Sequence, residues 1–371
     1  MEALAVSGDF WAGRRVFITG HSGFKGGWLS LWLQRLGAQV TGYALPPPEG
    51  PNLFGSAKVA DGMTSVIGDI RDYRSLRDAL FNARPEVVFH MAAQPLVRYS
   101  YANPIETYSV NVMGTAHLLE AVRETEGVRS VVNITSDKCY ENREWVWGYR
   151  ESDPVGGHDP YSSSKGCAEL VTSAYRNSYF SAGMNGQPQT GLASVRAGNV
   201  IGGGDWSTDR LLPDIVRAFA DGRPVVIRNP AAVRPWQHVL DPLAGYMDLA
   251  ERLFADGQEF GEAWNFGPDD SDVRPVKWVA EMAAKCWGGG AGTQIDVVAS
   301  GPHEAHLLKL DSSKSRARLG WRPVWGIDQA IQRTIDWYKA AKRQEDMHRF
   351  SLDQIGAHES ATSSMNASDG F

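Results

Sequence analysis

The chain has 371 residues, of which 43% are hydrophobic, and its formal net charge is −6 at pH 7. This length allows about two domains with a large core, and an acidic chain without a basic block lacks the charge pattern of a nucleic-acid-binding protein. The cysteines Cys139, Cys167 and Cys286 fit neither a disulfide framework nor a zinc site, and no run of about 18 apolar residues occurs, so we expect a soluble, unprocessed, cytoplasmic protein without a metal or a membrane partner.

The first half of the sequence alternates β-branched runs with amphipathic ones, which is typical of a parallel sheet with crossover helices. Strands are predicted at 14–20, 38–45, 64–69, 86–93, 129–136 and 190–199. Helices are predicted at 24–38, 72–83, 104–125 and 160–179. The first helix should pack one apolar face onto the sheet. We therefore predict an α/β fold with a Rossmann-type, doubly wound parallel sheet.

From about residue 200 the sequence becomes rich in glycine, proline and aromatic residues around one predicted helix at 211–221. A strand at 263–267 is expected to return to the main sheet. We therefore expect a Rossmann domain over 1–199 with a return segment near 238–267. An interleaved, smaller mixed α/β substrate lobe should cover most of 200–345, and the polar residues 346–371 should form a disordered tail.

A glycine-rich turn, "TGHSGFKG", follows the first strand and opens the first helix. It contains Gly20, Gly23 and Gly26, with Phe24 and Lys25 between them. Backbone N–H groups and the helix dipole can converge on a pyrophosphate at such a turn, and glycines let the backbone approach closely. The context favours dinucleotide binding, and the alternative is a tight turn with a purely structural role.

Two later segments fit the same cofactor. In "GDIRD", Asp69 can accept a hydrogen bond from an adenine amine beside Ile70, although a helix or loop cap is an equally good interpretation of Asp69. In "HMAAQ", the small Ala92 and Ala93 let the strand end lie against the cofactor, with Gln94 next to them. The end of the second strand offers neither the acid nor the arginine that would distinguish NAD from NADP.

A tyrosine and a lysine stand one helical turn apart in "DPYSSSK". Tyr161 and Lys165 are neighbours on one helix face. A free phenol has a pKa near 10, and a cation held beside it stabilises the phenolate and lowers that pKa. Together with the glycine turn, the pair is expected to act as a base that removes a hydroxyl proton during oxidation. The alternative is a solvated helix face.

These motifs together resemble the extended short-chain dehydrogenase/reductase family. The resemblance covers about residues 14–340 and rests on "TGHSGFKG", "GDIRD", "HMAAQ", "NITSD", "YSSSK" and "RAGNVIGGGD". Epimerases, decarboxylases and dehydratases of nucleotide sugars share these parts. "GFKGGWL", "TSDKCYEN", "RPWQHVLDPL" and "PHEAHLLKLD" are most similar to the branch that dehydrates CDP-glucose. The resemblance implies NAD as a recycled cofactor, a CDP-4-keto-6-deoxy-D-glucose product and a role in deoxysugar biosynthesis of the O-antigen type.

The stretch "TSDKCY" supplies the acid and base that a dehydratase needs beyond an epimerase. Related dTDP-glucose dehydratases have Thr-Asp-Glu here, whereas this chain has Ser136, Asp137 and Lys138. A charged Lys138 favours the carboxylate form of Asp137, and a shared proton lets either group deliver it. Our hypothesis is that Asp137 donates a proton to the leaving hydroxyl, Lys138 takes the proton from carbon 5, and Ser136 holds the 4-oxygen. A loop ion pair is the alternative.

Further candidates concern the substrate and the assembly. Arg234 is the first candidate for the nucleotide diphosphate, because a guanidinium suits phosphate oxygens, and Asn199 and Arg210 are further candidates. The alternative is that they are loop residues that tie the lobe together. His303 and His306 are expected near the sugar or at a helix start, not at a metal. The family resemblance implies a homodimer, or a dimer of dimers, through the helices at 104–125 and 160–179. A nucleotide-sugar 4-epimerase and a non-catalytic NAD-binding regulator remain the alternatives.

Overall fold

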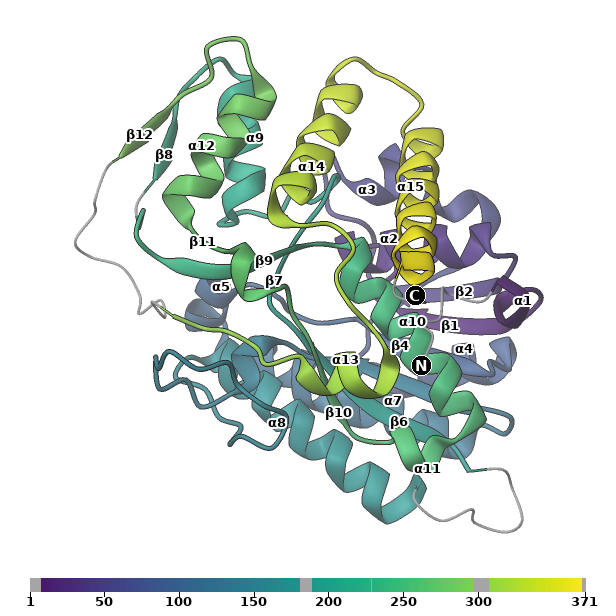
Figure 1. Cartoon of the computed structure of the whole chain (residues 1–371). Coiled ribbons are helices and arrows are strands. Elements are labelled where there is room, and N and C mark those ends of the chain that lie inside the picture. The colour runs from purple at the N-terminus through teal and green to yellow at the C-terminus, as the bar shows by residue number, and fades with distance from the viewer. Residues whose placement is uncertain (1–7, 181–188, 228, 296–306, 369–371) are drawn as a thin grey trace.

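Seven parallel strands form the central sheet of this computed structural model, which describes residues 8–180, 189–227, 229–295 and 307–368 (Figure 1). The strand order is β10-β6-β5-β4-β1-β2-β3. The bounds are β1 (Arg15–Thr19), β2 (Gln39–Ala44), β3 (Thr64–Ile67), β4 (Val87–His90), β5 (Ser130–Ile134), β6 (Gly191–Ala197) and β10 (Ala263–Phe266). The predicted parallel α/β sheet is thus confirmed, including the strand that returns at 263–267.

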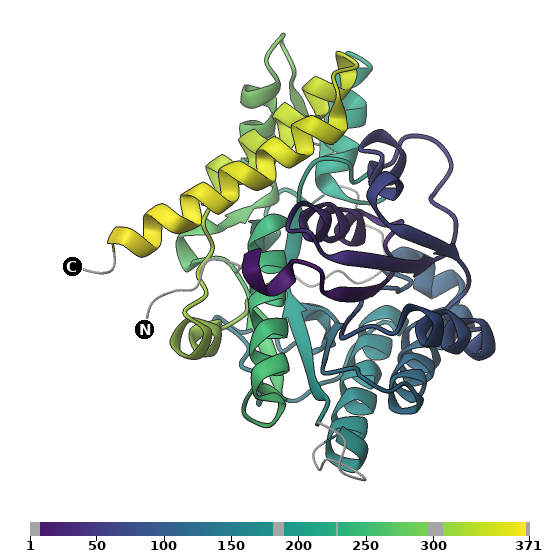
Figure 2. The ribbon, with the colours of Figure 1, turned by 90° about the vertical axis from the view of Figure 1, so that its right-hand side faces the viewer.

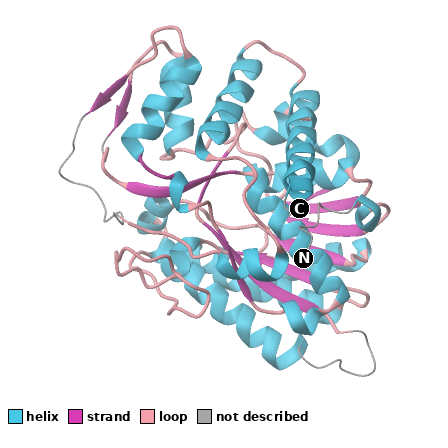
Figure 3. Ribbon diagram, viewed as in Figure 1, coloured by secondary structure: helices cyan, strands magenta, loops and turns pink. Residues whose placement is uncertain are grey.

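Helices cover both faces of this sheet (Figure 3). On one face lie α4 (Tyr73–Ala83), α7 (Gly114–Glu124) and α8 (Pro160–Tyr175), and on the other lie α2 (Phe24–Arg35) and α10 (Leu240–Ala255). Successive strand residues point to opposite faces, so Phe17 packs in the core of α4 and α7 while Val16 and Ile18 pack in the core of α2 and α10. Because both faces are covered, the strands read as continuous apolar runs.

Successive strands are added to the sheet in one direction from β1 and in the opposite direction from β4, so the strand order reverses between these two neighbours. From β1 the chain proceeds through β2 to β3 at one edge, and from β4 it proceeds through β5 and β6 toward the other edge. The loops that follow β1 and β4 therefore diverge at the carboxyl ends of these strands. Ligands of open parallel sheets bind in the crevice at such a switch point.

The helix α2 is buried on all sides, which differs from the expected single apolar face. All residues over 26–33 are buried. The reason is the C-terminal helix α15 (Met347–Ser368), which covers the outer side of α2. Trp32 Nε1 donates to Glu359 Oε1 at 2.8 Å, and the Trp32 ring packs edge-on against His358.

The predicted disorder of residues 346–371 is wrong for Met347–Ser368, which form α15. This helix packs against α14 (Ile327–Lys342) and α2, and Figure 2 shows it running along the outside of the molecule. Ile355 and His358 are fully buried, and His358 Nε2 lies 2.9 Å from Asp241 Oδ1 of α10. The ordering comes from these contacts with distant parts of the chain.

A smaller lobe stands beside the carboxyl ends of the central strands. It contains the sheet β11-β9-β7, formed by β7 (Asn199–Ile201), β9 (Val233–His238) and β11 (Val273–Pro275), and the pair β8 (Val225–Ile227) with β12 (Thr293–Ile295). The helices α9 (Leu211–Ala220), α12 (Val276–Trp287) and α14 pack together beside them. The predicted helix at 211–221 corresponds to α9. The proposed boundaries at 199 and 345 stay an interpretation of this interleaved chain.

The remaining elements are short and connect the main ones. They are α1 (Gly8–Trp11), α3 (Leu53–Ser56), α5 (Val97–Ala102), α6 (Pro104–Tyr108), α11 (Gly257–Phe260), α13 (Ser313–Leu319) and the turns η1 (Val59–Gly62), η2 (Ser109–Met113), η3 (Asp137–Cys139), η4 (Arg176–Phe180) and η6 (Asp270–Asp272). The helix predicted at 104–125 thus consists of α6, the π turn η2 and α7. The helix predicted at 160–179 consists of α8 and the π turn η4.

Candidate active site

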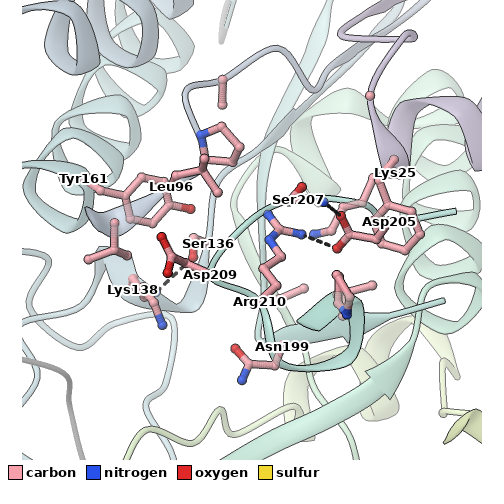
Figure 4. A pocket seen from close by; sticks show the side chains of 18 of the residues that line it. Lys25, Leu96, Ser136, Lys138, Tyr161, Asn199, Asp205, Ser207, Asp209 and Arg210 are labelled. Carbon is pink, nitrogen blue, oxygen red and sulfur yellow. Dashed lines mark hydrogen bonds and ion pairs between the residues drawn. The ribbon is translucent and has the colours of Figure 1, made fainter. Parts of the chain in front are cut away.

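A cavity of about 1240 Å³ lies at the carboxyl ends of the central strands and extends under the loops of the smaller lobe. It brings together residues from the glycine turn, from the ends of β4 and β5, from α8 and from the loop after β7 (Figure 4). The predicted site residues that line it are Gly20, Gly23, Phe24, Lys25, Gly26, Asp69, Ile70, Ala92, Ala93, Ser136, Asp137, Lys138, Tyr161, Lys165, Asn199, Arg210 and Arg234.

The glycine turn is a backbone cradle that a side chain would fill. Gly20 has a φ of +79°, and a Cβ there would lie 2.7 Å from the backbone nitrogen of Ala92. A Cβ on Gly26 would lie 2.2 Å from the carbonyl oxygen of Gly20. Gly23 is the N-cap of α2, and no side chain caps this helix. Its first N–H groups are therefore available to phosphate oxygens, as a dinucleotide requires.

A threonine and a histidine hold the ends of β1 and β4 together behind this turn. Thr19 Oγ1 accepts from the N–H groups of Met91 and Ala92 at 3.1 and 3.2 Å. The Thr19 hydroxyl can therefore donate its own proton to His90 Nδ1, which lies 2.7 Å from Thr19 Oγ1. On the other side of the ring, His90 Nε2 lies 3.2 Å from Thr115 Oγ1. Burial lowers the pKa of His90 to about 3, so the ring is neutral. No sequence motif indicated this network, because Thr19, His90 and Thr115 are distant in the chain.

Asp69 lines the cavity and does not cap the following helix. The N-cap of α4 is Asp72, whose side chain accepts from the N–H of Ser75. Asp69 instead binds Arg71, with 2.6 Å between Oδ2 and Nη2. The hydrogen bond from Arg71 lowers the pKa of Asp69, so the carboxylate is ionised at neutral pH and can accept a hydrogen bond.

Gln94 was predicted to touch the cofactor, and the structure places it outside the cavity lining. Its amide nitrogen donates to Leu96 O at 3.1 Å and to Thr107 Oγ1 at 2.9 Å, while its Oε1 accepts from the Leu96 N–H. The side chain is thus engaged in fixing the loop after β4.

The start of α8 places Tyr161 and Lys165 in the cavity wall. Asp159 is the N-cap and accepts from the N–H of Ser162, and Pro160 occupies the first helical position. Tyr161 therefore lies in the first turn, with Lys165 one turn further. Both side chains are buried, at 7% and 6% exposure.

The expected lowering of the phenol's pKa does not occur in the structure. Burial raises the pKa of Tyr161 to about 12 and outweighs a hydrogen bond with Ser136 that acts in the opposite direction. Burial also lowers the pKa of Lys165 to about 8, and its Nζ donates to Ile134 O at 3.4 Å. The phenol thus keeps its proton at neutral pH unless further positive charge is brought beside it.

A buried ion pair lies one turn further along α8. Glu169 Oε2 binds Arg196 Nη2 at 2.8 Å and accepts from Ser194 at 2.6 Å, and Thr135 donates to the other oxygen. Burial alone would raise the pKa of Glu169, but Arg196 and these hydrogen bonds lower it. The resulting negative charge raises the pKa of Lys165 against the effect of burial. No local sequence pattern indicates this pair, because its two partners are distant in the chain.

Ser136, Asp137 and Lys138 form the turn that follows β5. The Ser136 hydroxyl accepts from the Lys138 N–H at 3.2 Å and lies 3.0 Å from Asp137 Oδ1, to which it donates. Asp137 is 3% exposed, and its Oδ2 has no hydrogen-bond partner among the described residues. The Lys138 ammonium forms no ion pair with Asp137. Figure 4 shows Ser136 and Lys138 on the same side of the cavity as Tyr161.

The smaller lobe contributes the predicted substrate residues. Asn199, Arg210 and Arg234 line the cavity, and Arg210 Nη1 binds Asp205 Oδ2 at 2.9 Å. Asp205 is 4% exposed and was not predicted. His303 and His306 lie outside the described residues. Within the described ranges, no cluster of three potential metal ligands occurs and no helix is long and apolar enough to cross a membrane.

Comparisons with known proteins show the family and the fold. The profile of the GDP-mannose 4,6 dehydratase family matches residues 17–334. The chain is 57% identical over 357 residues to a CDP-glucose 4,6-dehydratase of Salmonella typhimurium, and this match covers 96% of this chain and 99% of the relative. The structure of MoeE5 in complex with UDP-glucose and NAD is 25% identical, with a TM-score of 0.73 over 88% of this chain and 99% of that one. A dTDP-glucose 4,6-dehydratase of Streptomyces venezuelae, 24% identical with a TM-score of 0.75 over 90% of this chain and 99% of that one, has the same fold.

Proposed function

The chain belongs to the GDP-mannose 4,6 dehydratase family, and from this premise we propose that it converts CDP-D-glucose to CDP-4-keto-6-deoxy-D-glucose with NAD as its cofactor. The choice of CDP-glucose is supported by the 57% identity to the Salmonella relative, which extends over nearly the whole of both chains. Relatives of the same family are named for other nucleotide sugars and are far less similar, at 26% identity for a dTDP-glucose 4,6-dehydratase of Xanthomonas campestris.

One observation carries the proposal: the phenol of Tyr161 and the carboxylate of Asp137 line the same cavity, beside Ser136. Dehydration across carbons 5 and 6 of a 4-ketohexose needs one group at the 4-oxygen and others at carbons 5 and 6. A single sugar ring can reach both groups only if they share a cavity. An epimerase would need the phenol alone.

Tyr161 is the proposed base for the 4-hydroxyl. NAD, when bound, supplies the acceptor and later the donor in the redox steps, and its oxidised ring brings a positive charge to the site. Lys165 supplies a second positive charge one turn along α8, backed by the carboxylate of Glu169. These charges act against the burial that raises the pKa of Tyr161 to about 12. Ser136 is the proposed hydrogen-bond partner of the 4-oxygen.

Asp137 and Lys138 are the proposed acid and base for the elimination. Once carbon 4 carries a carbonyl, the proton on carbon 5 becomes acidic, and Lys138 in its neutral form takes it. Asp137 in its protonated form gives a proton to the 6-hydroxyl, which leaves as water. Oδ2 of Asp137 is buried without a hydrogen-bond partner among the described residues, and such burial costs less for a protonated carboxyl than for a carboxylate, which supports this role.

Binding and assembly complete the proposal. Arg234, Arg210 and Asn199 are proposed to contact the nucleotide diphosphate. The cytoplasm is the proposed compartment, where the product would serve deoxysugar and lipopolysaccharide biosynthesis.

A homodimer or dimer of dimers through α6, α7 and α8 would cover the exposed side chains of Ile105 and Leu170, which are 81% and 60% exposed. Such exposed apolar side chains on neighbouring helices are typical of a subunit interface.

Product analysis tests the proposed reaction directly. The purified protein with NAD is incubated separately with CDP-glucose, UDP-glucose and dTDP-glucose, and the alkaline absorbance of a 4-keto-6-deoxy sugar is measured. We expect it from CDP-glucose. Tyr161→Phe should reduce the rate by about 10²–10⁴-fold, while Tyr175→Phe on the same helix should leave it unchanged. A product that keeps its 6-hydroxyl would indicate an epimerase, and bound NAD without turnover would indicate a regulator.

A further inference from the structure

Lys25 is a cation in the cavity, and none of the described residues is a hydrogen-bond partner of its side chain. It lies in the first turn of α2, and its side chain lines the cavity. Within the described part of the chain, no hydrogen bond or ion pair engages its ammonium group. Burial lowers the pKa of Lys25 to about 8, and the positive charges of Arg210 and Lys165 act in the same direction, so the ammonium still predominates at neutral pH.

The charges around Lys25 leave an excess of positive charge. Asp137 and Asp205 are the carboxylates that act on Lys25 in the opposite direction. Asp205 is already bound to Arg210 at 2.9 Å, and one oxygen of Asp137 accepts from Ser136. When Glu169, which acts on Lys165, and its partner Arg196 are included, four cations face three carboxylates, and two of these carboxylates are already paired. A buried or half-buried excess of cations favours an anionic ligand.

The position of Lys25 indicates which anion it binds. The pyrophosphate of the cofactor can be held by the free N–H groups at the start of α2, for which no side chain is needed. The Lys25 side chain lies instead beside Asp205 and Arg210, as Figure 4 shows. These two residues belong to the loop after β7, which forms part of the smaller lobe on the proposed substrate side of the cavity.

We infer that Lys25 and Arg210 together bind the diphosphate of the nucleotide sugar, so that a residue of the cofactor-binding turn serves the substrate. The inference rests on the proposed function for the identity of the nucleotide. Arg210, held by Asp205, presents a fixed guanidinium, and Lys25 supplies a second charge from the opposite lobe. The diphosphate would thereby bridge the two lobes.

Nucleotide binding tests this assignment without turnover. The dissociation constants of CDP and CMP are measured by titration calorimetry on the NAD-loaded wild-type protein and on its Lys25→Met variant. Methionine has an unbranched side chain of similar length and lacks the charge. We expect CDP to bind at least about tenfold more weakly to the variant, because a charged hydrogen bond is lost, and CMP to be much less affected. Lys25→Arg should restore much of the difference.

A matched control and the opposite outcomes complete the test. Lys277→Met removes an exposed lysine of α12 that pairs with Glu281, and it should change neither constant. Equal weakening of CDP and CMP, no change in either, or a loss of bound NAD would overturn the inference. If Lys25→Met does not fold, Lys25→Gln is measured in its place. Wild-type protein that binds CDP but does not convert CDP-glucose would contradict the proposed function alone.

Discussion

The Ser136 hydroxyl donates to Asp137 Oδ1 at 3.0 Å, and the same side chain lowers the pKa of the Tyr161 phenol against the effect of burial. One serine thus connects the proposed base for the 4-hydroxyl with the proposed acid for the 6-hydroxyl. Since a serine hydroxyl has a single proton, it can serve only one of them as a donor at a time. The two groups are therefore coupled.

Ser136→Ala should raise the pKa of Tyr161, because the hydrogen bond from Ser136 is a cause that lowers it. We expect turnover at neutral pH to fall by about tenfold or more, and the acidic limb of the rate profile to move to higher pH. Rate profiles against pH for wild type and variant measure both effects. Ser136→Thr keeps the hydroxyl and should retain the wild-type profile. An unshifted profile in the alanine variant would contradict this coupling.

Lys138→Met and Asp137→Asn should stop the reaction at different points. With Lys138→Met, carbon 5 should no longer exchange its proton with deuterated solvent, because the proposed base is missing. With Asp137→Asn, exchange at carbon 5 should continue while elimination stops, because the amide cannot protonate the leaving hydroxyl. Nuclear magnetic resonance of the bound and released sugars measures both. Exchange at the native rate in Lys138→Met would exclude Lys138 as this base.

His90 should make the free energy of unfolding depend on pH. Burial lowers the pKa of His90 from 6.5 to about 3, so the folded state keeps the ring neutral while the unfolded state takes up a proton below pH 6.5. The stabilisation is complete above this pH and is lost as the pH falls toward 3, by up to about 1.4 kcal/mol per pH unit.

Urea unfolding at pH 7, 6 and 5 measures this dependence. His90→Gln should lower the stability at pH 7, since it disturbs the contacts with Thr19 and Thr115, and it should have a shallower slope than wild type. The exposed His158 provides the matched control, and His158→Gln should leave the slope unchanged. A His90→Gln protein with the wild-type slope would show that His90 is not responsible.

The pair His358–Asp241 should be a main anchor of α15. Both side chains are fully buried and lie 2.9 Å apart. His358→Ala removes one partner and leaves the carboxylate with the Val324 N–H, so we expect a loss of about 3 kcal/mol in the free energy of unfolding. Denaturant midpoints measure this loss. Arg349→Ala, on the exposed side of the same helix, should cost little. Equal midpoints for the two variants would contradict the proposed anchor.

The sequence predicted the parts of the fold that depend on local pattern. The central strands, the glycine turn and the helix carrying Tyr161 and Lys165 each have a signature within a few residues, including the N-cap Asp159 and Pro160. Asn199 of β7, Arg234 of β9 and Arg210 before α9 were candidates from the sequence, and all three line the same cavity. Their contact with a diphosphate stays a prediction.

The remainder depends on contacts between distant residues. The polar composition of α15 conceals the buried Ile355 and His358, and the partner of His358, Asp241, lies more than a hundred residues earlier. Glu169 and Arg196 likewise have no local pattern that would pair them. The hydrogen bonds of Gln94 to Leu96 and Thr107 could not be seen in the sequence either, and its contact with the cofactor stays a prediction. The raised pKa of Tyr161 reflects burial, which the spacing of Tyr161 and Lys165 does not reveal.

The fate of the hydrogen at carbon 4 tests the central claim most directly. CDP-glucose labelled with deuterium at carbon 4 is converted by the NAD-loaded protein, and the product is examined by nuclear magnetic resonance. If Tyr161 and Asp137 act on one sugar in one cavity, the deuterium must appear on carbon 6 of a 4-keto-6-deoxy sugar. Deuterium that remains on carbon 4 of a sugar with an intact 6-hydroxyl would contradict the proposed dehydration.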